Sequence, residues 1–107
     1  MAERTFPGEI KRWVDGDTVD INVDLGFKVW SIQRFRLADI NCPEKGQPGY
    51  AEAIEACLKL APVGVRAEVI CTGYDRYGRW IARIRPYDST QSVNEYLLAN
   101  NLATIYN

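Results

Sequence analysis

Two aspartates flank a glycine in the segment Asp15-Gly16-Asp17, directly before a stretch of alternating apolar residues. Hard cations such as calcium take oxygen ligands, and a tight turn at the mouth of a strand offers carboxylates together with accessible backbone carbonyls. A plain turn with solvated aspartates has the same composition, because Asp and Gly are typical turn residues. The segment therefore indicates either a cation site or an ordinary turn.

An arginine and a glutamate follow further along the chain. Arg36 alternates with Phe35 and Leu37, which places its side chain on the opposite face of a strand from these two apolar residues. A planar guanidinium can bind two phosphate oxygens at once, and an ordinary exposed arginine is the alternative. Glu44 follows Pro43 in a loop. Its carboxylate is ionised at neutral pH and can hold a water as general base, and an ordinary loop glutamate is the alternative.

The chain contains no histidine. This excludes Ser-His-Asp and Cys-His hydrolases, zinc sites built on histidine, and nucleases whose general base is histidine. Cys42 therefore has no base to activate it as a nucleophile, and we interpret it as a small loop residue whose backbone carbonyl matters more than its thiol. Any hydrolytic chemistry must come from carboxylates, arginines, hydroxyls or a hard metal ion.

A second charged segment, residues 75–79, precedes another apolar stretch. It places Arg76 and Arg79 on either side of Tyr77 and a glycine. Two guanidinium groups and a phenol are suited to a phosphate or nucleotide clamp. A charged β-turn is the alternative.

Periodicity predicts the elements that position these residues. Alternation of period two is typical of a half-buried strand, and helical spacing through residues 49–61 ends at Pro62 and Gly64. Ser92 and Glu95 form a capping box, which predicts a short helix ending near Asn100. The predicted strands are 9–14, 18–25, 28–37, 65–72 and 80–85, with a loop at 38–48 and an extended tail at 102–106.

This order, β-β-β-α-β-β-α, predicts a mainly β fold with helices, namely a five-stranded Greek-key barrel of the OB type. The chain of 107 residues is expected to form a single domain spanning 1–107, and 47% hydrophobic and 25% charged residues are ordinary for a soluble protein. There is no apolar run long enough to cross a membrane and no N-terminal signal pattern. We therefore expect no membrane partner.

Charge and cysteine usage give weaker indications. A net charge of −1 argues against a protein that coats nucleic acid through broad electrostatics, but leaves room for a local basic cleft. The three cysteines lie far apart with no C-x-x-C pair. Such a set is typical of free thiols, so a cytoplasmic location and no disulfide are expected, and secretion with a signal that has been removed is the alternative.

Four motifs in this order together resemble the thermonuclease family, the staphylococcal-nuclease-like domains. The motifs are D-G-D-T-V at 15–19, F-R-L-x-x-I-x-x-P-E at 35–44, D-R-Y-G-R at 75–79 and S-V-N-E-x-L-x-x-x-x-L-A at 92–103. The resemblance runs from about residue 9 to 106. It implies an OB barrel that cleaves DNA and RNA with calcium, with little sequence preference, and leaves 3′-phosphate products.

The resemblance also implies roles for the residues that match the family's motifs. The implied residues are Arg36, Glu44 and Arg79 as catalytic groups, Asp17, Asn41 and Cys42 as metal ligands, and Arg76 and Tyr77 as contacts to nucleotide phosphates.

Asn41 departs from the family pattern, because the best-known members have a second metal-binding aspartate there. An amide oxygen can ligate calcium but brings a dipole in place of a full charge, so we expect weak calcium binding without substrate. Alternatively, Asp39 or Asp15 supplies the missing charge. Tyr106 lies close to, but not clearly on, the position of the family's base-stacking tyrosine.

The sequence thus predicts a calcium-dependent nuclease that acts as a monomer on DNA or RNA. The first alternative is an OB module that binds single-stranded nucleic acid without cutting it. Such a module should have lost site carboxylates or arginines, whereas Asp17, Arg36, Glu44 and Arg79 all remain. The second alternative is an aromatic cage for peptides, but Trp13, Trp30 and Trp80 are expected mostly to pack against the core or surface.

Overall fold

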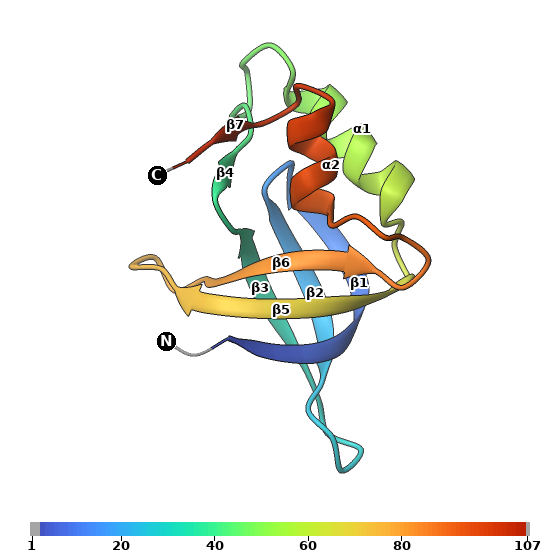
Figure 1. Cartoon of the computed structure of the whole chain (residues 1–107). Helices are drawn as coiled ribbons and strands as arrows, with labels where there is room; N and C mark the ends of the chain where they lie inside the picture. The colour runs from blue at the N-terminus through green and yellow to red at the C-terminus, as the bar shows by residue number, and fades with distance from the viewer. Residues whose placement is uncertain (1–2, 107) are drawn as a thin grey trace.

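The computed structural model describes residues 3–106, and its elements follow one another around a barrel (Figure 1). The strands are β1 (Arg4–Asp15), β2 (Thr18–Asp24), β3 (Trp30–Leu37), β4 (Ile40–Asn41), β5 (Arg66–Tyr74), β6 (Trp80–Pro86) and β7 (Thr104–Ile105). The helices are α1 (Tyr50–Leu60) and α2 (Val93–Ala99). Neither helix is long and apolar enough to cross a membrane, as far as residues 3–106 are concerned.

Five strands close the barrel in the order β1-β2-β3-β6-β5, as the OB fold predicts. The long strand β1 serves two neighbours, because its first half pairs with β5 and its second half with β2. The closing pair, β3 with β6, is the parallel one. Figure 1 shows both helices at one end of the barrel and the β2–β3 turn projecting at the other.

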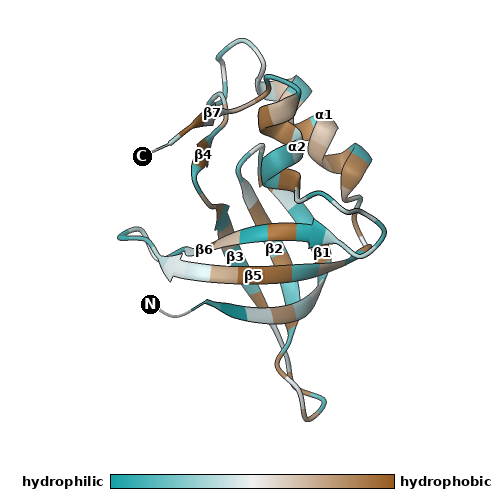
Figure 2. Cartoon of the chain, in the orientation of Figure 1, coloured by the Kyte–Doolittle hydropathy of each residue, from teal (hydrophilic) through white to brown (hydrophobic). Residues whose placement is uncertain are grey.

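The core follows the period-two pattern of the strands. Val19, Ile21 and Val23 are buried, whereas Asp20 and Asn22 between them are half-exposed. Each such aliphatic side chain contributes about 1.5–3 kcal/mol when it is fully buried. Figure 2 shows these apolar bands along the strands, and α1 adds its own buried side, Ala53 and Cys57. The barrel interior and its helical cover therefore form one core.

The capping box of α2 is confirmed. The Ser92 hydroxyl accepts a hydrogen bond from the backbone N–H of Glu95, and the Glu95 carboxylate accepts one from the N–H of Ser92. Helix α1 lacks a side-chain cap, and its N-cap Gly49 has φ 94°, a conformation that favours glycine. Its acidic first turn and basic last turn, Glu52 and Lys59, suit the helix dipole.

The first predicted strand began too late. Residues 4–8 also belong to β1, although Pro7 and Gly8 weaken strand propensity, and Pro7 pairs with Glu68. Gly8 is required where β1 passes over the core, since a Cβ there would lie 2.7 Å from the Ile21 Cγ2 atom. Both residues thus permit the strand to continue across the barrel.

The loop predicted at 38–48 was also wrong in part. Its Ile40 and Asn41 form β4, and the tail at 104–105 pairs with them as β7, so that Ile40 lies opposite Ile105 and Asn41 opposite Thr104. Between β3 and β4, Asp39 turns the chain and has a φ angle of 64°. The tail therefore joins the wall of the region where the charged motifs meet.

The three tryptophans contact different partners. The Trp13 indole donates to the carbonyl of Ala61, Trp80 packs edge-on against Tyr74, and the Arg66 guanidinium lies over Trp30. These contacts are packing and hydrogen-bonding contacts within the protein.

Candidate active site

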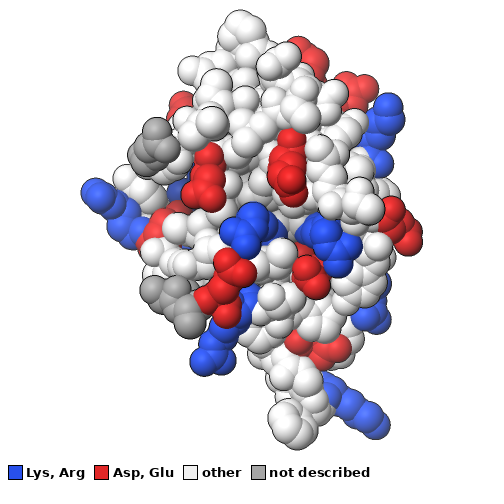
Figure 3. Space-filling model, in the orientation of Figure 1, with Lys and Arg blue, Asp and Glu red and all other residues white. Residues whose placement is uncertain are grey.

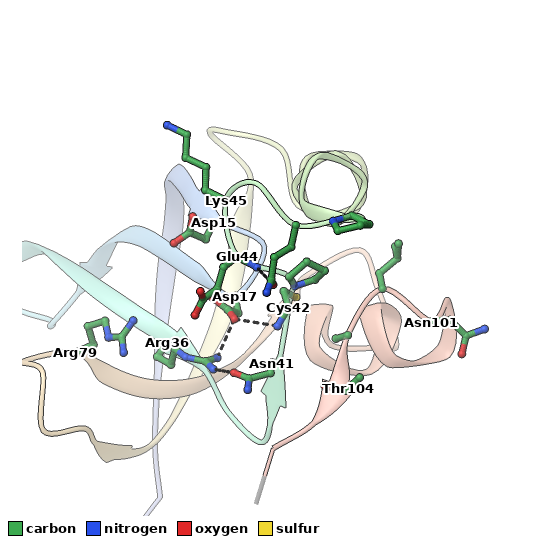
Figure 4. A pocket seen from close by; sticks show the side chains of 15 residues that line it. Asp15, Asp17, Arg36, Asn41, Cys42, Glu44, Lys45, Arg79, Asn101 and Thr104 are labelled. Atoms are coloured by element: carbon green, nitrogen blue, oxygen red, sulfur yellow. Dashed lines mark hydrogen bonds and ion pairs between the residues drawn. The ribbon is translucent and has the colours of Figure 1, made fainter.

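A hollow of about 1020 Å³ lies where β2, β3 and β4 meet the loop before α1 and the segment after α2 (Figure 4). All six residues expected to be catalytic groups or metal ligands line it, namely Asp17, Arg36, Asn41, Cys42, Glu44 and Arg79. Tyr77 lines a shallower neighbouring hollow, and Arg76 lines neither. The structure thus brings the expected catalytic and metal-ligating residues together and leaves the expected nucleotide contacts outside.

Asp17 is fixed by the tight turn that precedes β2. Its Oδ2 atom accepts the backbone N–H of Cys42 at 3.0 Å and lies 3.5 Å from the Arg36 Nη1 atom. The preceding Gly16 packs so closely on α1 that a Cβ would lie 2.7 Å from the Cβ of Ala53. Glycine is therefore needed at position 16 for close packing, and the turn places the Asp17 carboxylate at the hollow.

Arg36 is held by the turn that follows its own strand. Its Nη1 atom donates to the carbonyls of Leu37 and Ile40 at 3.1 and 2.9 Å, and its Nη2 atom donates to the amide oxygen of Asn41. The ring of Tyr106 lies 5.7 Å from the guanidinium carbon. The side chain is only 14% exposed, so its orientation is set by the fold.

Arg79 is oriented by a carboxylate that sequence reasoning placed only in a turn. Asp75 Oδ2 accepts the Nε–H of Arg79 at 2.8 Å, and Asp75 Oδ1 accepts the backbone N–H groups of Tyr77 and Arg79. Burial alone would raise the pKa of Asp75, but these hydrogen bonds outweigh it and lower the pKa below its usual value. Because Nε is engaged, the terminal amino groups remain to face the hollow.

Glu44 lies in a turn closed by Gln47. The Gln47 side-chain oxygen accepts the backbone N–H of Glu44 at 2.8 Å, and the Gln47 N–H donates to the Glu44 carbonyl at 2.9 Å. Its carboxylate makes no hydrogen bond to the protein within residues 3–106 and is exposed at the hollow. Both oxygens can therefore accept hydrogen bonds from a water molecule.

Asp15 is the acidic group best placed to add charge beside Asp17. It lines the hollow, and its Oδ1 atom accepts the Tyr50 hydroxyl at 2.9 Å, a bond that raises the pKa of Tyr50. Asp39 does not line the hollow, and its carbonyl is used by the N–H of Tyr106. The role of Tyr50 carried no sequence signal, because it is 35 residues distant and lies in the first turn of a helix.

Cys42 is placed as a loop residue rather than as a nucleophile. Burial, with the negative charge of Asp17 nearby, raises the pKa of its thiol to about 12. A thiol in this state is a poor nucleophile at neutral pH. All three cysteines are buried and free.

The expected metal ligands are oxygen atoms, which suit a hard cation, but only one of them belongs to a charged group. The Asp17 carboxylate, the Asn41 amide oxygen and the Cys42 carbonyl are oxygen donors of the kind that calcium prefers. No group of three or more His, Cys, Asp or Glu side chains within residues 3–106 is arranged to hold a metal ion. A cation here would therefore depend on neutral oxygens, water and substrate, and the Asn41 amide oxygen already accepts a hydrogen bond from Arg36.

Charges of both signs alternate around the hollow. Three carboxylates (Asp15, Asp17 and Glu44) face three cations (Arg36, Lys45 and Arg79). Figure 3 shows this mixture of basic and acidic groups across the middle of the face. The site is therefore a local arrangement of charges and not part of a broad basic surface.

The chain is therefore an OB-fold domain in which carboxylates and arginines meet in one hollow at the barrel. The model of the staphylococcal nuclease homologue family matches residues 34–107 of the chain. The chain belongs to this family, which confirms the resemblance seen in its motifs.

Two curated relatives support this assignment. The chain is 36% identical over 110 residues to a protein named micrococcal nuclease from Shigella flexneri, covering 94% of this chain and 59% of the relative. It is 38% identical over 79 residues to protein ParB from Escherichia coli, covering 72% and 40% of the two chains. The chain therefore spans only part of the length of each relative.

Proposed function

We propose that this domain is a calcium-dependent nuclease that hydrolyses phosphodiester bonds of DNA or RNA with little sequence preference. The observation that carries the proposal is the meeting of Glu44, Arg36 and Arg79 beside Asp17 in one hollow. Membership of the nuclease homologue family and the printed name of the Shigella relative support it.

The two arginines bind and stabilise the reacting phosphate. Each is anchored through some of its N–H groups and keeps others for the hollow, so a guanidinium fork meets phosphate oxygens without reorganisation. Charge that develops on these oxygens in the transition state is stabilised by the same groups. Glu44 orients a water and accepts its proton.

The residues that would hold calcium are Asp17, Asn41 and the Cys42 carbonyl, with Asp15 close by. When bound, the ion supplies positive charge that neutralises and polarises the phosphate. Cleavage on the 5′-oxygen side, leaving 3′-phosphate products, follows from the family resemblance. A monomeric state and a cytoplasmic location remain predictions.

The direct experiment is incubation of the protein with plasmid and with single-stranded DNA or RNA, in calcium or in chelator. We expect degradation in calcium and none in chelator. Intact substrate in calcium would contradict the proposal.

A second candidate is an OB module that holds single-stranded nucleic acid without cutting it. The spacing of the acidic side chains favours it, because no group of three or more His, Cys, Asp or Glu side chains within residues 3–106 is arranged to hold a metal ion. Binding of a labelled oligonucleotide without products in calcium would support this candidate.

A further inference from the structure

The first half of β3 has a strand partner on one side only. Residues 30–34 pair with β2, but the pairing of β3 with β6 covers only Phe35 to Leu37. No other strand within residues 3–106 pairs with residues 30–34 on the side away from β2. This segment is termed the free edge. Figure 1 shows that it leads into the β2–β3 turn, which projects from the barrel.

The register of β3 shows which backbone groups of the free edge are directed outwards. The N–H of Leu37 donates to the Asp17 carbonyl on the β2 side, and the N–H of the next residue, Ala38, donates to β6 instead. In an antiparallel pair, residues bonded to the partner alternate with residues whose N–H and C=O point the other way. Trp30 and Ile32 therefore direct these groups away from β2. Unpaired groups at a strand edge are a template for another extended chain.

Large apolar side chains are exposed on the same hairpin. Ile32 is 63% exposed, Trp30 is partly exposed beside it, and Phe27 at the turn is fully exposed. Leu25 and Val29, on either side of the turn, are exposed as well. Single exposed apolar residues are ordinary, but several that gather in one place mark an interaction site.

The turn holds Phe27 in a conformation that its residue type disfavours. Phe27 and Lys28 have φ angles of 55° and 64°. Hairpin turns with positive φ are normally formed by glycine, asparagine or aspartate, and a bulky residue there is strained. Because the Phe27 side chain is fully exposed, packing within the domain does not offset this cost. Strain of this kind is typical of functional segments, so the turn indicates a partner for Phe27 outside the domain.

Charge decides between the possible partners. Residues 25–36 contain three cations, Lys28, Arg34 and Arg36, and no acidic residue. Arg34 is paired with Asp20, whereas Lys28 forms no ion pair within residues 3–106. A second copy paired through the same edge would bring these cations opposite one another, and like charges in opposite positions destabilise a sheet. A partner that carries carboxylates is favoured instead.

We propose that the free edge of β3 binds an extended segment of another protein by strand addition, and that this segment alternates apolar and acidic side chains. The backbone groups of Trp30 and Ile32 provide the hydrogen bonds. The apolar side chains cover Ile32 and the β2–β3 turn, and the acidic ones lie beside Lys28 and Arg34. None of residues 25–34 lines the hollow of the candidate active site, so the partner binds the domain and leaves that hollow open.

The test begins with a phage-displayed library of random twelve-residue peptides, selected against the immobilised wild-type domain. We expect the enriched peptides to alternate apolar and acidic residues along the stretch that pairs with the free edge. Absence of enrichment, or enriched peptides without acidic residues, would overturn the proposal. Fluorescence anisotropy of a labelled enriched peptide then gives Kd values for the wild type and for variants.

Ile32→Pro tests the strand addition. Proline removes the outward N–H of Ile32 and leaves the ladder to β2 in place, since proline is tolerated on strand edges whose N–H faces solvent. Kd should rise about tenfold or more, while urea unfolding shows a folded barrel. Ile32→Val is the matched control, because it retains the N–H and should bind like the wild type. Equal binding by a folded Ile32→Pro variant would refute the strand addition.

Two further variants test the proposal even if Ile32→Pro does not fold. Lys28→Glu places a carboxylate beside the acidic segment and should raise Kd about tenfold, because like charges then meet. Lys59→Glu is the matched control, since Lys59 is exposed on α1 at the other end of the barrel (Figure 1). Phe27→Gly should weaken peptide binding but raise the urea midpoint, because glycine removes the strain at this φ angle. Unchanged binding by both variants, or a lower midpoint for Phe27→Gly, would contradict the proposal.

Competition separates the other possible occupants. In chelator, an excess of an eight-nucleotide single strand should not displace the peptide. Displacement would assign the edge to a nucleic acid and overturn the proposal. Sedimentation should show a monomer, and a dimer that Ile32→Pro abolishes would assign the edge to a second copy and overturn it as well.

Discussion

Arg36 and Arg79 are held in the same hollow by different means. Backbone carbonyls of the β3–β4 turn fix Arg36, whereas the Asp75 side chain fixes Arg79. In both side chains some N–H groups of the rigid guanidinium are hydrogen-bonded to the protein, and the others can bind a ligand. A flexible lysine ammonium could not be oriented in this way. The arginines are therefore oriented before substrate arrives.

The first prediction concerns chemistry at the reacting phosphate. Glu44→Gln should lower kcat by about 10²–10⁴ because it removes the base, and Arg79→Ala by about 10²–10³ because it removes transition-state stabilisation. Initial rates on single-stranded DNA in calcium provide the measurement. Arg83→Ala should retain wild-type activity. Undiminished cutting by both site variants would refute the assignment.

The second prediction concerns charge at the cation site. Asn41→Asp should tighten calcium binding about tenfold, roughly 1.4 kcal/mol, because a full charge replaces a dipole. Calorimetric titration without substrate measures it directly. Asn101→Asp is the control, since Asn101 also lines the hollow but is not an expected ligand. Equal affinities of Asn41→Asp and wild type would mean that Asn41 is not a ligand or that Asp15 already supplies the charge.

Sequence reasoning located the groups that face the hollow better than the groups that hold them. Asp17, Arg36 and Glu44 lie in short motifs that match a family pattern. The anchoring role of Tyr50 has no such signal, because its contact with Asp15 depends on where α1 packs. Arg76 was expected to touch nucleotide, but its position in an exposed turn places it outside both hollows.

At the scale of the elements, α2 is hydrogen-bonded to the barrel through the buried side chain of Asn94. Asn94 accepts the N–H of Ile84 and donates to the carbonyls of Ala38 and Ala82. It thereby joins the helix to β6 and to the end of β3, next to the site.

The third prediction follows from these bonds. Asn94→Ala should lower the free energy of unfolding by about 2–4 kcal/mol, because it leaves buried backbone groups unpaired. Urea unfolding followed by tryptophan fluorescence measures the change. Asn100→Ala is the control, because Asn100 is exposed and makes a single bond to the Tyr96 carbonyl. Equal, small losses would contradict the role given to Asn94.

The predictability of elements differed between central and marginal strands. Strands β2 and β3 alternate clearly, and their predicted limits were nearly right because burial on one face imposes period two. Strand β7 has two exposed residues, so its pairing depends on a distant strand and leaves no local pattern. Residues 4–8 form a strand because they pair with β5, and this distant pairing overrides the weak local propensity of Pro7 and Gly8.

For the molecule as a whole, the titratable groups predict how stability depends on pH. The hydrogen bond from Arg34 lowers the pKa of Asp20, and the bonds to Asp75 lower its pKa against the effect of burial. A carboxylate with a lowered pKa in the folded state stabilises the fold above its unfolded pKa of about 3.9, and this contribution is lost as the pH falls further.

At alkaline pH the buried cysteines have the opposite effect, and the free energy of unfolding decreases as the pH rises. Burial raises the pKa of Cys42 to about 12 and also raises the pKa of Cys57. The unfolded chain loses these protons first, near pH 8.5, so stability decreases as the pH rises above about that value.

The fourth prediction combines both limits. Because the chain has no histidine, unfolding free energy should be nearly constant between about pH 5 and pH 8. It should fall below about pH 4 and above about pH 9. Urea titrations across this range test it, and Cys42→Ser should weaken the alkaline decrease. A steep change between pH 6 and pH 7 would contradict the expectation.

The three buried thiols can also serve as reporters of local opening. Cys42 lies at the hollow, Cys57 in α1 and Cys71 in β5, and they are 8%, 0% and 8% exposed. A thiol reagent can react only when the surrounding segment opens, so the labelling rate at each cysteine measures the opening of a different part of the fold. We expect Cys57 to react most slowly. Calcium with a nucleotide should protect Cys42 more than Cys71, and mass spectrometry of the labelled protein can follow all three rates in one experiment.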